Sequence, residues 1–290
     1  MTDESPPAQA RTTAYVNRLP DESVNYSKEH PLPEFAWLVA GVLTIVVVGS
    51  ALVIGFAGTL AAHIPFDTER DIAQAISTLW SPPKASSDGL KVQEALTVIA
   101  ERLVKAMPEA KDITINVYLD ERPIVNAAAT IGGNIVMYRG LLEKLDSEDA
   151  VAMVLAHEIA HAALRHPPAH LGRGISLSLI MATLSTTVGV SDGSKLFQMA
   201  GSLPMLKYGR DQESEADAAG VAALVSVYGH IGGAADLFGV FRQAGEGVEF
   251  LQTHPLTSHR ISDVENIARK NGWATDGVRK PLPESIRSLK

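Results

Sequence analysis

The sequence predicts an α+β fold that is mainly α-helical, in which one transmembrane helix precedes a domain with a small, mostly antiparallel sheet. Three observations support this prediction. Residues 35–62 carry no Asp, Glu, Lys or Arg, over a length sufficient to cross a bilayer. Apolar residues recur with helical spacing through most of the remaining chain. Alternating, strand-like patterns are confined to residues 113–138.

The transmembrane prediction rests on the length and uniformity of the apolar run. Residues 34–62 are rich in β-branched side chains, and Trp37 lies near their start, where it suits a membrane interface. A buried core helix is the alternative, but the absence of charge over this length disfavours it. A cleaved signal peptide fits poorly because a long polar segment precedes the run.

The charges around the apolar run predict its orientation. Arg11, Arg18 and Lys28 precede it, whereas Arg70 is the first Lys or Arg after it. The positive-inside rule then places the N-terminus in the cytoplasm and the folded domain on the non-cytoplasmic side.

Composition divides the chain into five segments. Polar residues with several prolines predict a disordered N-terminal tail, and a Ser-Pro-Pro stretch predicts a linker after the membrane helix. The predicted segments are a tail at 1–33, a transmembrane helix at 34–62, a linker at 63–88, a folded domain at 89–273 and a loose C-terminal tail at 274–290.

Overall composition excludes several classes of function. The formal net charge is −8, so we expect no nucleic-acid partner. The chain has no cysteine, which excludes a disulfide framework, a thiol nucleophile and a Cys-ligated metal.

The first half of the domain combines one helix with the sheet. Helical spacing predicts a helix over residues 90–107, ended by Pro108. The predicted strands are 113–119, 127–131 and 134–138, with Gly132-Gly133 as the turn between the last two. An exposed sheet edge would accept an extended peptide as an added strand. An ordinary packed sheet without a ligand is an equal alternative.

The next predicted helix carries the motif His157-Glu158-Ile159-Ala160-His161. Asp146 or Ser147 can cap its start, and Pro167-Pro168 is expected to end it after Arg165 and His166. Two His four residues apart lie on one face of a helix and can reach one metal ion. The Glu between them would point at the open position of that metal. Two satisfied histidines without a metal are the alternative.

A catalytic zinc ion needs a third protein ligand. In a helix starting near Arg210, Glu213 and Asp217 share a face and Glu215 points elsewhere. We therefore expect Glu213 to bind the metal and Asp217 to accept the outer N–H of a ligating His. An acidic, solvated helix face is the alternative.

Other helices are expected around this site. Residues 174–190 are apolar but rich in Ser and Thr, and we interpret them as a helix packed on the domain or dipping into the bilayer surface. The C-terminal helices are expected at 216–228, 232–244 and 258–270.

The segments HEIAH (His157–His161) and ESEAD (Glu213–Asp217) resemble peptidase family M48, which comprises membrane-associated zinc metalloendopeptidases of the HtpX and CAAX prenyl protease types. Further similar segments are Asn126-Ala127, Gly132 to Ile135, Arg139 to Leu142, Arg165-His166, His254-Pro255 and Arg260-Ile261. The resemblance covers residues 90–270 and is nearest to members with a single-span, soluble domain.

The resemblance implies a zincin-like domain in which His157, His161 and Glu213 bind one Zn²⁺ ion. It also implies that Glu158 is the catalytic residue. The chemistry of these residue types agrees, because a carboxylate beside a metal-bound water is suited to act as its general base.

His254 and Arg260 lie in the matching C-terminal segment. Both are candidates to stabilise the oxyanion that forms during peptide hydrolysis. His254 has a second possible role, because an imidazole near an open zinc position can bind the metal, displace the water and hold the enzyme inactive.

The sequence thus predicts a single-pass membrane metalloendopeptidase, with its domain on the non-cytoplasmic side of a bacterial inner membrane. Its expected partners are the lipid bilayer, through residues 34–62, and protein or peptide substrates, including misfolded membrane or envelope proteins in protein quality control. The alternative is a zinc-containing chaperone or adaptor that binds unfolded chains with little cleavage. A purely structural zinc site is disfavoured, because such sites usually have four protein ligands.

Overall fold

A computed structural model describes residues 31–75, 82–188, 208–244 and 248–290, in two units, Met1–Gly49 and Ser50–Lys290. Helix α1 (Pro31–Ala62) contains the predicted apolar run. The most apolar 18-residue window of its segment Leu32–Ala62 has a mean hydropathy of 2.6 and contains no buried residue. Among the described residues, α1 is the one helix that is long and apolar enough to cross a membrane. The tail predicted at 1–33 lies almost wholly outside the described residues.

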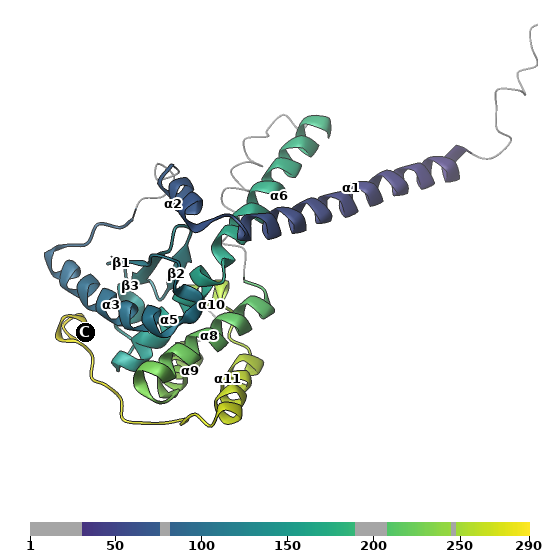
Figure 1. Cartoon of the computed structure of the whole chain (residues 1–290). Helices are drawn as coiled ribbons and strands as arrows, with labels where there is room; N and C mark the ends of the chain where they lie inside the picture. Colours follow the sequence, from purple (N-terminus) through teal and green to yellow (C-terminus); the bar gives the residue numbers. More distant parts are fainter. Residues whose placement is uncertain (1–30, 76–81, 189–207, 245–247) are drawn as a thin grey trace, which may run out of the picture. The chain divides into compact units, whose positions relative to one another are not determined.

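Helix α5 (Glu148–Ala163) lies at the centre of the second unit (Figure 1). Every residue from Glu148 to Ala162 is buried, because α3, α8, α9 and the sheet pack against different faces of the helix. Ala and other small or aliphatic residues make this possible, since they leave room for neighbours on all sides. The helix that carries the HExxH motif is therefore also the core of the domain.

Both ends of α5 are set by local chemistry. Ser147 caps the start, where its Oγ accepts a hydrogen bond from Ala150 N at 3.2 Å. The helix ends at Ala163, earlier than expected, because Arg165 adopts a left-handed conformation with φ of 64°. Pro167-Pro168 does not end α5. These prolines lie in the first turn of α6 (His166–Val188), where no intrahelical N–H bond is lost.

The sheet is mixed, where a mostly antiparallel one was expected. Its strands are β1 (Asn116–Asp120), β2 (Ala127–Thr130) and β3 (Asn134–Tyr138). Gly132 and Gly133, with φ of 77° and 73°, form the turn of an antiparallel β2–β3 hairpin. The strand order is β1-β3-β2 and β1 pairs with β3 in parallel, because residues 121–126 carry the chain across β3 to its far side. Strand β2 therefore forms an edge.

The remaining elements surround α5. Helix α3 (Ser87–Ala106) begins at Ser86, whose Oγ accepts from Gly89 N at 3.1 Å, and buries an apolar face. The others are α2 (Phe66–Ala75), the 3₁₀ turn Pro108–Ala110, α4 (Arg139–Leu142), α8 (Arg210–Tyr228), α9 (Gly232–Ala244), α10 (Glu249–Thr253), α11 (Ser258–Asn271) and α12 (Glu284–Arg287).

Two segments that follow α1 in space or in sequence are helical. Part of the linker predicted at 63–88 forms α2. The apolar segment predicted at 174–190 belongs to α6 up to Val188, and its last two residues are not described. The start of α6 packs closely on the end of α1, since a Cβ on Gly172 would lie 2.7 Å from the Ala61 Cβ.

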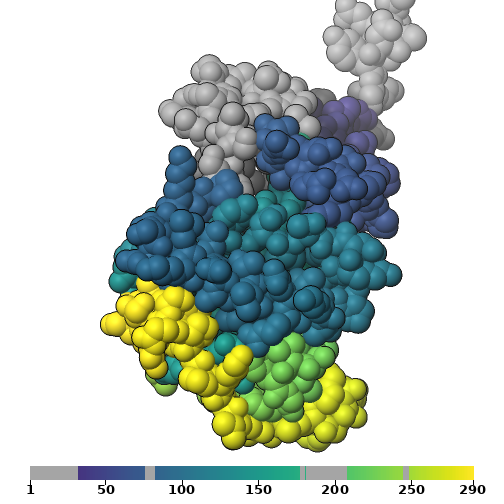
Figure 2. All heavy atoms as spheres, turned by 60° about the vertical axis from the view of Figure 1, so that its left-hand side comes forward, coloured from purple at the N-terminus to yellow at the C-terminus, as the bar shows by residue number. Residues whose placement is uncertain are grey.

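The C-terminal residues, expected to form a loose tail at 274–290, instead pack on the domain. Leu282 and Ile286 are buried, and α12 contacts α3. The backbone of Lys280 also bonds the start of α5, donating to Asp149 Oδ2 at 2.7 Å and accepting from Glu148 N at 2.9 Å. Figure 2 shows this segment, in yellow, lying against the blue part of the domain. Two well-spaced apolar side chains are too weak a pattern to predict this docking.

Candidate metal centre

His157 and His161 project from one face of α5 toward the same point. Their Nε2 atoms are 3.0 Å apart, and both side chains are buried. Helix α8 approaches this face closely at Gly220, where a Cβ would lie 3.2 Å from His157 N. Because Gly220 has no side chain, the two helices pack closely here, and the acidic face of α8 lies against the two imidazoles.

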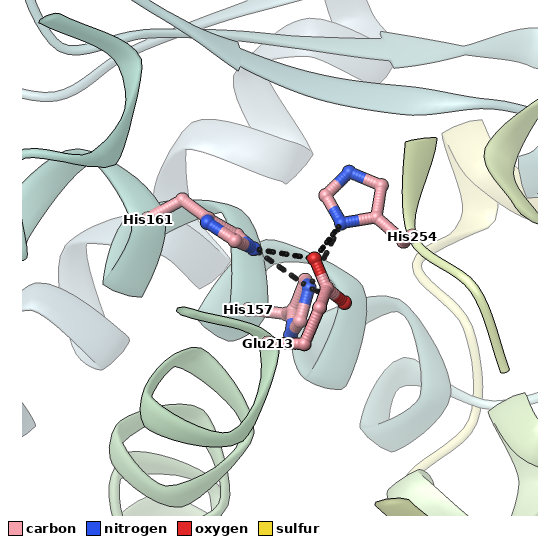
Figure 3. A group of neighbouring side chains, drawn as sticks. All are labelled: His157, His161, Glu213 and His254. Carbon is pink, nitrogen blue, oxygen red and sulfur yellow. Dashed lines mark hydrogen bonds and ion pairs between the residues drawn. The ribbon is translucent and has the colours of Figure 1, made fainter. Parts of the chain in front are cut away.

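Glu213 and His254 complete a four-residue cluster (Figure 3). Glu213 comes from α8, and its oxygens lie 3.6 Å from His157 Nε2 and 3.5 Å from His161 Nε2. His254 follows α10, and its Nδ1 lies 2.9 Å from Glu213 Oε1 and 3.3 Å from His157 Nε2. One ligand atom from each residue lies within 4.8 Å of all the others.

This cluster has the dimensions of a tetrahedral metal site. Bonds of 2.0–2.1 Å to nitrogen and oxygen give a tetrahedron with edges of about 3.3 Å. With Glu213 Oε1 as the ligand atom, four of the distances given above, 2.9–3.5 Å, lie near that length. The 3.6 Å distance to His157 runs from the other carboxylate oxygen, Oε2. Three imidazole nitrogens and one carboxylate oxygen, all buried, could therefore hold a metal ion that forms bonds of 2.0–2.1 Å.

The electrostatics of the cluster suit metal binding. Burial alone would raise the pKa of Glu213, but His161, His254 and His157 outweigh it and hold that pKa below its ordinary value. Burial lowers the pKa of His161 below its ordinary value. A metal ligand must be an ionised carboxylate or a neutral imidazole, and these two shifts favour those forms. The pKa of His157 shifts the other way: burial lowers it, but Asp217 and Glu213 outweigh burial and raise it above its ordinary value.

Asp217 and Arg260 lie behind this cluster. Asp217 Oδ1 is 3.0 Å from His157 Nδ1, the distance expected of a carboxylate that orients a ligating His. Arg260 donates to Asp217 from Nε and Nη2 at 2.7 and 2.8 Å, and its Nη1 lies 2.6 Å from Glu213 Oε2. Each guanidinium nitrogen is thus engaged by a carboxylate, which favours a positioning role for Arg260 over the oxyanion contact expected from sequence.

The contacts on the outer side of His161 were not predicted from the sequence. Its Nδ1 lies 2.8 Å from His166 Nδ1, and His166 Nε2 lies 3.2 Å from Glu215 Oε2. With His161 Nε2 turned to the cluster, its Nδ1–H donates to His166, whose Nε2–H donates to Glu215. Helical spacing could not reveal this chain, because α5 ends between the two histidines.

Tyr208, also overlooked, covers the same side of the cluster. Its ring stacks on His161 with centroids 3.9 Å apart and a 28° angle between the planes. Its backbone N–H donates to Thr253 O at 3.3 Å, joining the start of α8 to the segment that carries His254. Burial raises the pKa of Tyr208, so its hydroxyl stays protonated. A single aromatic residue forms no pattern from which sequence could predict this contact.

Glu158 is buried beside the cluster and is held by the edge strand. Its Oε2 accepts a hydrogen bond from Ala129 N in β2 at 2.7 Å. Its Oε1 lies 3.7 Å from His254 Nε2 and has no hydrogen-bond partner among the residues that the structure describes. One carboxylate oxygen is therefore fixed and the other is free to contact a molecule at the centre.

Comparison with known proteins identifies a domain family. The family model described as Peptidase family M48 matches residues 90–268, which is more than half of the chain. This segment contains most of α3, the sheet, α5 and all the residues of the cluster.

Individual relatives agree with this match. A beta-barrel assembly-enhancing protease of Yersinia pestis is 33% identical over 175 residues, covering 53% of this chain and 34% of the relative. The mitochondrial metalloendopeptidase OMA1 of Schizosaccharomyces pombe is 27% identical over 176 residues, covering 58% and 52%. Metalloprotease YcaL of Escherichia coli is 26% identical over 200 residues, covering 67% and 76%. The chain thus spans about half or less of the first two relatives.

Proposed function

Because the chain belongs to peptidase family M48, we propose that it is a membrane-anchored, zinc-dependent metalloendopeptidase. The observation that carries this proposal is the convergence of His157, His161 and Glu213 beside Glu158. Two His and one Glu, with a nearby carboxylate that has a free oxygen, are the groups needed for hydrolysis of a peptide bond by a metal-activated water.

The chain's own residues would have separate roles in this reaction. His157, His161 and Glu213 hold Zn²⁺, which when bound lowers the pKa of a water and polarises the scissile carbonyl. Asp217 orients the His157 imidazole, and His166 orients that of His161. These contacts fix the tautomers that leave both Nε2 atoms available as ligands.

Glu158 would act as the general base. Its Oε1 takes the proton of the attacking water and passes it to the leaving amine, while Ala129 N–H holds Oε2. Burial excludes bulk water from the carboxylate, so the proton remains available for this second transfer.

The edge strand would align the substrate. Strand β2 bonds β3 on one side, and its other side lies next to Glu158. An extended peptide added along this edge would place its backbone near the cluster. We propose unfolded or misfolded membrane and envelope proteins as substrates in quality control, which is consistent with the name of the Yersinia relative.

His254 would control access to the metal. Its Nδ1 lies in the cluster at ligand distances rather than at a position beside it. We therefore favour the role in which this imidazole fills the fourth coordination position and holds the enzyme inactive until it moves away.

Proteolysis of an unfolded protein tests this function. The full chain, purified in detergent with zinc, is compared with Glu158→Gln and with the exposed control Glu101→Gln. We expect cleavage by the parent and by E101Q, and a loss of at least ~10²-fold in E158Q with one zinc still bound per chain. Zinc binding with cleavage by neither parent nor E158Q, even after removal of the His254 imidazole, would favour the chaperone alternative. No bound zinc would refute the metal centre.

A further inference from the structure

Glu69 is a buried acid in the short helix that follows the membrane helix. Helix α2 is otherwise half-buried or exposed along its length, but Glu69 is only 4% exposed. Burying a carboxylate is costly unless other groups satisfy it. Its contacts therefore show why this helix docks where it does.

The two oxygens of Glu69 bond two different parts of the domain. Oε1 accepts a hydrogen bond from Gly132 N, in the β2–β3 turn, at 2.6 Å. Oε2 forms an ion pair with Arg165 Nη1, between α5 and α6. Burial raises the pKa of Glu69, although Gly132 and Arg165 both oppose this, so the carboxylate depends on these two partners rather than on solvent.

Arg165 is held in an unusual conformation at this contact. Its φ of 64° lies in the left-handed region that few residues other than glycine adopt. Its Nη2 donates to Ile64 O at 2.5 Å, and its guanidinium lies 5.7 Å from the centre of the Phe66 ring. The segment before α2 thus contributes to holding the end of α5.

Helix α2 also packs directly on the β2–β3 turn. A Cβ on Gly132 would lie 2.9 Å from the Ala73 Cβ, and one on Gly133 would lie 3.0 Å from Phe66 Cζ. The glycines therefore provide both the positive φ of the turn and the space that α2 occupies.

The two partners of Glu69 are close in sequence to the candidate catalytic groups. Gly132 lies three residues after Ala129, whose N–H bonds Glu158. Arg165 lies four residues after His161. One carboxylate therefore bridges the edge strand and the end of the metal-binding helix, the two elements between which a substrate would lie.

We propose that Glu69 is a positioning residue that fixes the spacing between β2 and α5. By this inference helix α2, which lies outside the matched family segment 90–268, supports the proposed active site. The inference rests on the proposed peptidase function for its effect on catalysis, but its structural part can be tested without cleavage.

A set of variants of the zinc-loaded full chain separates this role from simple stabilisation. Glu69→Gln keeps an acceptor for Gly132 N–H but loses the ion pair, whereas Arg165→Gln loses the same pair from its other side. Asp71→Asn removes an exposed carboxylate from the same helix and serves as the control. Cleavage per zinc-loaded, folded chain is measured well below the unfolding temperature, together with amide hydrogen exchange across residues 127–133.

We expect kcat/KM to fall ~10- to 100-fold in E69Q and in R165Q, since small displacements of catalytic groups have effects of this size. Zinc content should remain at one per chain, and D71N should behave as the parent. The double variant should lose no more than the worse single variant, because the two residues act through one contact. Exchange at 127–133 should rise in E69Q, because a carboxamide without the ion pair to Arg165 holds the Gly132 N–H less firmly.

Other results would overturn the proposal. Unchanged cleavage and exchange in E69Q would show that the contact positions nothing, and a lower unfolding temperature alone would show a merely stabilising ion pair. If the parent cleaves nothing but exchange rises in E69Q, the bridge stands and the peptidase function fails.

The parent chain alone provides a last measurement, which does not require any variant to fold. The Gly132 amide lies in a tight turn, where exchange is normally fast, and the bridge predicts that it is protected. Rapid exchange at Gly132 would contradict the inference.

Discussion

At the scale of single residues, His254 is the side chain that we propose to close the centre. Its imidazole contacts Glu213, and the centres of its ring and the His157 ring are 5.1 Å apart. Phe250 stacks on it with centroids 4.5 Å apart, so the ring is held in place by packing as well as by the cluster. Displacing it requires movement of the short segment that includes α10.

We predict that His254→Ala increases the rate of cleavage, because the substitution leaves the fourth metal position to water. The increase should be measurable as initial rate per bound zinc on an unfolded protein. His259→Ala, an exposed histidine on α11, should have no effect. An unchanged or lower rate in H254A under all conditions would instead support a role for His254 in stabilising the oxyanion.

Local spacing anticipated the proximity of several site residues. The i,i+4 relation brings His157 and His161 together on α5, and the same relation puts Glu213 and Asp217 on one face of α8. The positions of Tyr208 and His254 depend on how distant segments dock. No periodicity within one element could have placed them, although a resemblance to a family pointed to His254.

At the scale of elements, the start of α5 depends on a buried glutamate. Glu148 Oε1 accepts hydrogen bonds from Arg102 Nη2 at 2.5 Å and from Tyr228 Oη at 2.9 Å. It also forms an ion pair with Lys280 Nζ at 2.9 Å. Burial alone would raise the pKa of Glu148, but these donors outweigh it and lower that pKa below 4.5. The ionised carboxylate therefore joins α3, α8 and the C-terminal segment to the first turn of the central helix.

We predict that Glu148→Gln lowers the free energy of unfolding by about 1–2 kcal/mol at pH 7, less than for a fully buried pair because Arg102 and Lys280 are partly exposed. A lowered folded-state pKa stabilises the protein above the unfolded-state pKa, and this contribution disappears as pH falls through the folded-state value. The difference between E148Q and the parent should therefore shrink below pH 4.5 in urea titrations. A difference independent of pH would contradict this assignment.

The C-terminal segment provides a second prediction for an element. Ile286 in α12 is fully buried, whereas Val278, a few residues earlier, is 95% exposed. Ile286→Ala should lower the free energy of unfolding by about 2–4 kcal/mol, the cost of a cavity in a packed core. Val278→Ala should change it by less than about 0.5 kcal/mol. Equal, small effects in urea titrations would restore the interpretation of residues 274–290 as a loose tail.

The sheet shows what could not be predicted about elements. The strand positions and the Gly132-Gly133 turn follow from alternation and glycine chemistry. The parallel pairing of β1 with β3 depends on the path of residues 121–126, which is set by packing against the rest of the domain. Sequence patterns specify which segments can pair, but a connection without a turn motif leaves the choice of partner open.

At the scale of the whole molecule, the proposed membrane anchor leads to a prediction about the side on which the domain lies. The absence of cysteine makes this measurable, because a single introduced Cys is a unique label site. We predict that Ser262→Cys, exposed on α11, reacts with a membrane-impermeant maleimide from the non-cytoplasmic side. Ser27→Cys, before α1, should react only after the membrane is permeabilised. The reverse pattern would show that the few charges near α1 do not set its orientation.

The four residues of the candidate centre come from widely separated parts of the chain, and His254 lies 97 positions after His157. During synthesis, the segment bearing His157 and His161 leaves the ribosome long before the segments that carry Glu213 and His254. A chain that has not been synthesised as far as Glu213 therefore lacks the proposed metal centre. The proposed activity would therefore belong only to molecules in which the helix carrying Glu213 has already docked on the helix carrying His157 and His161.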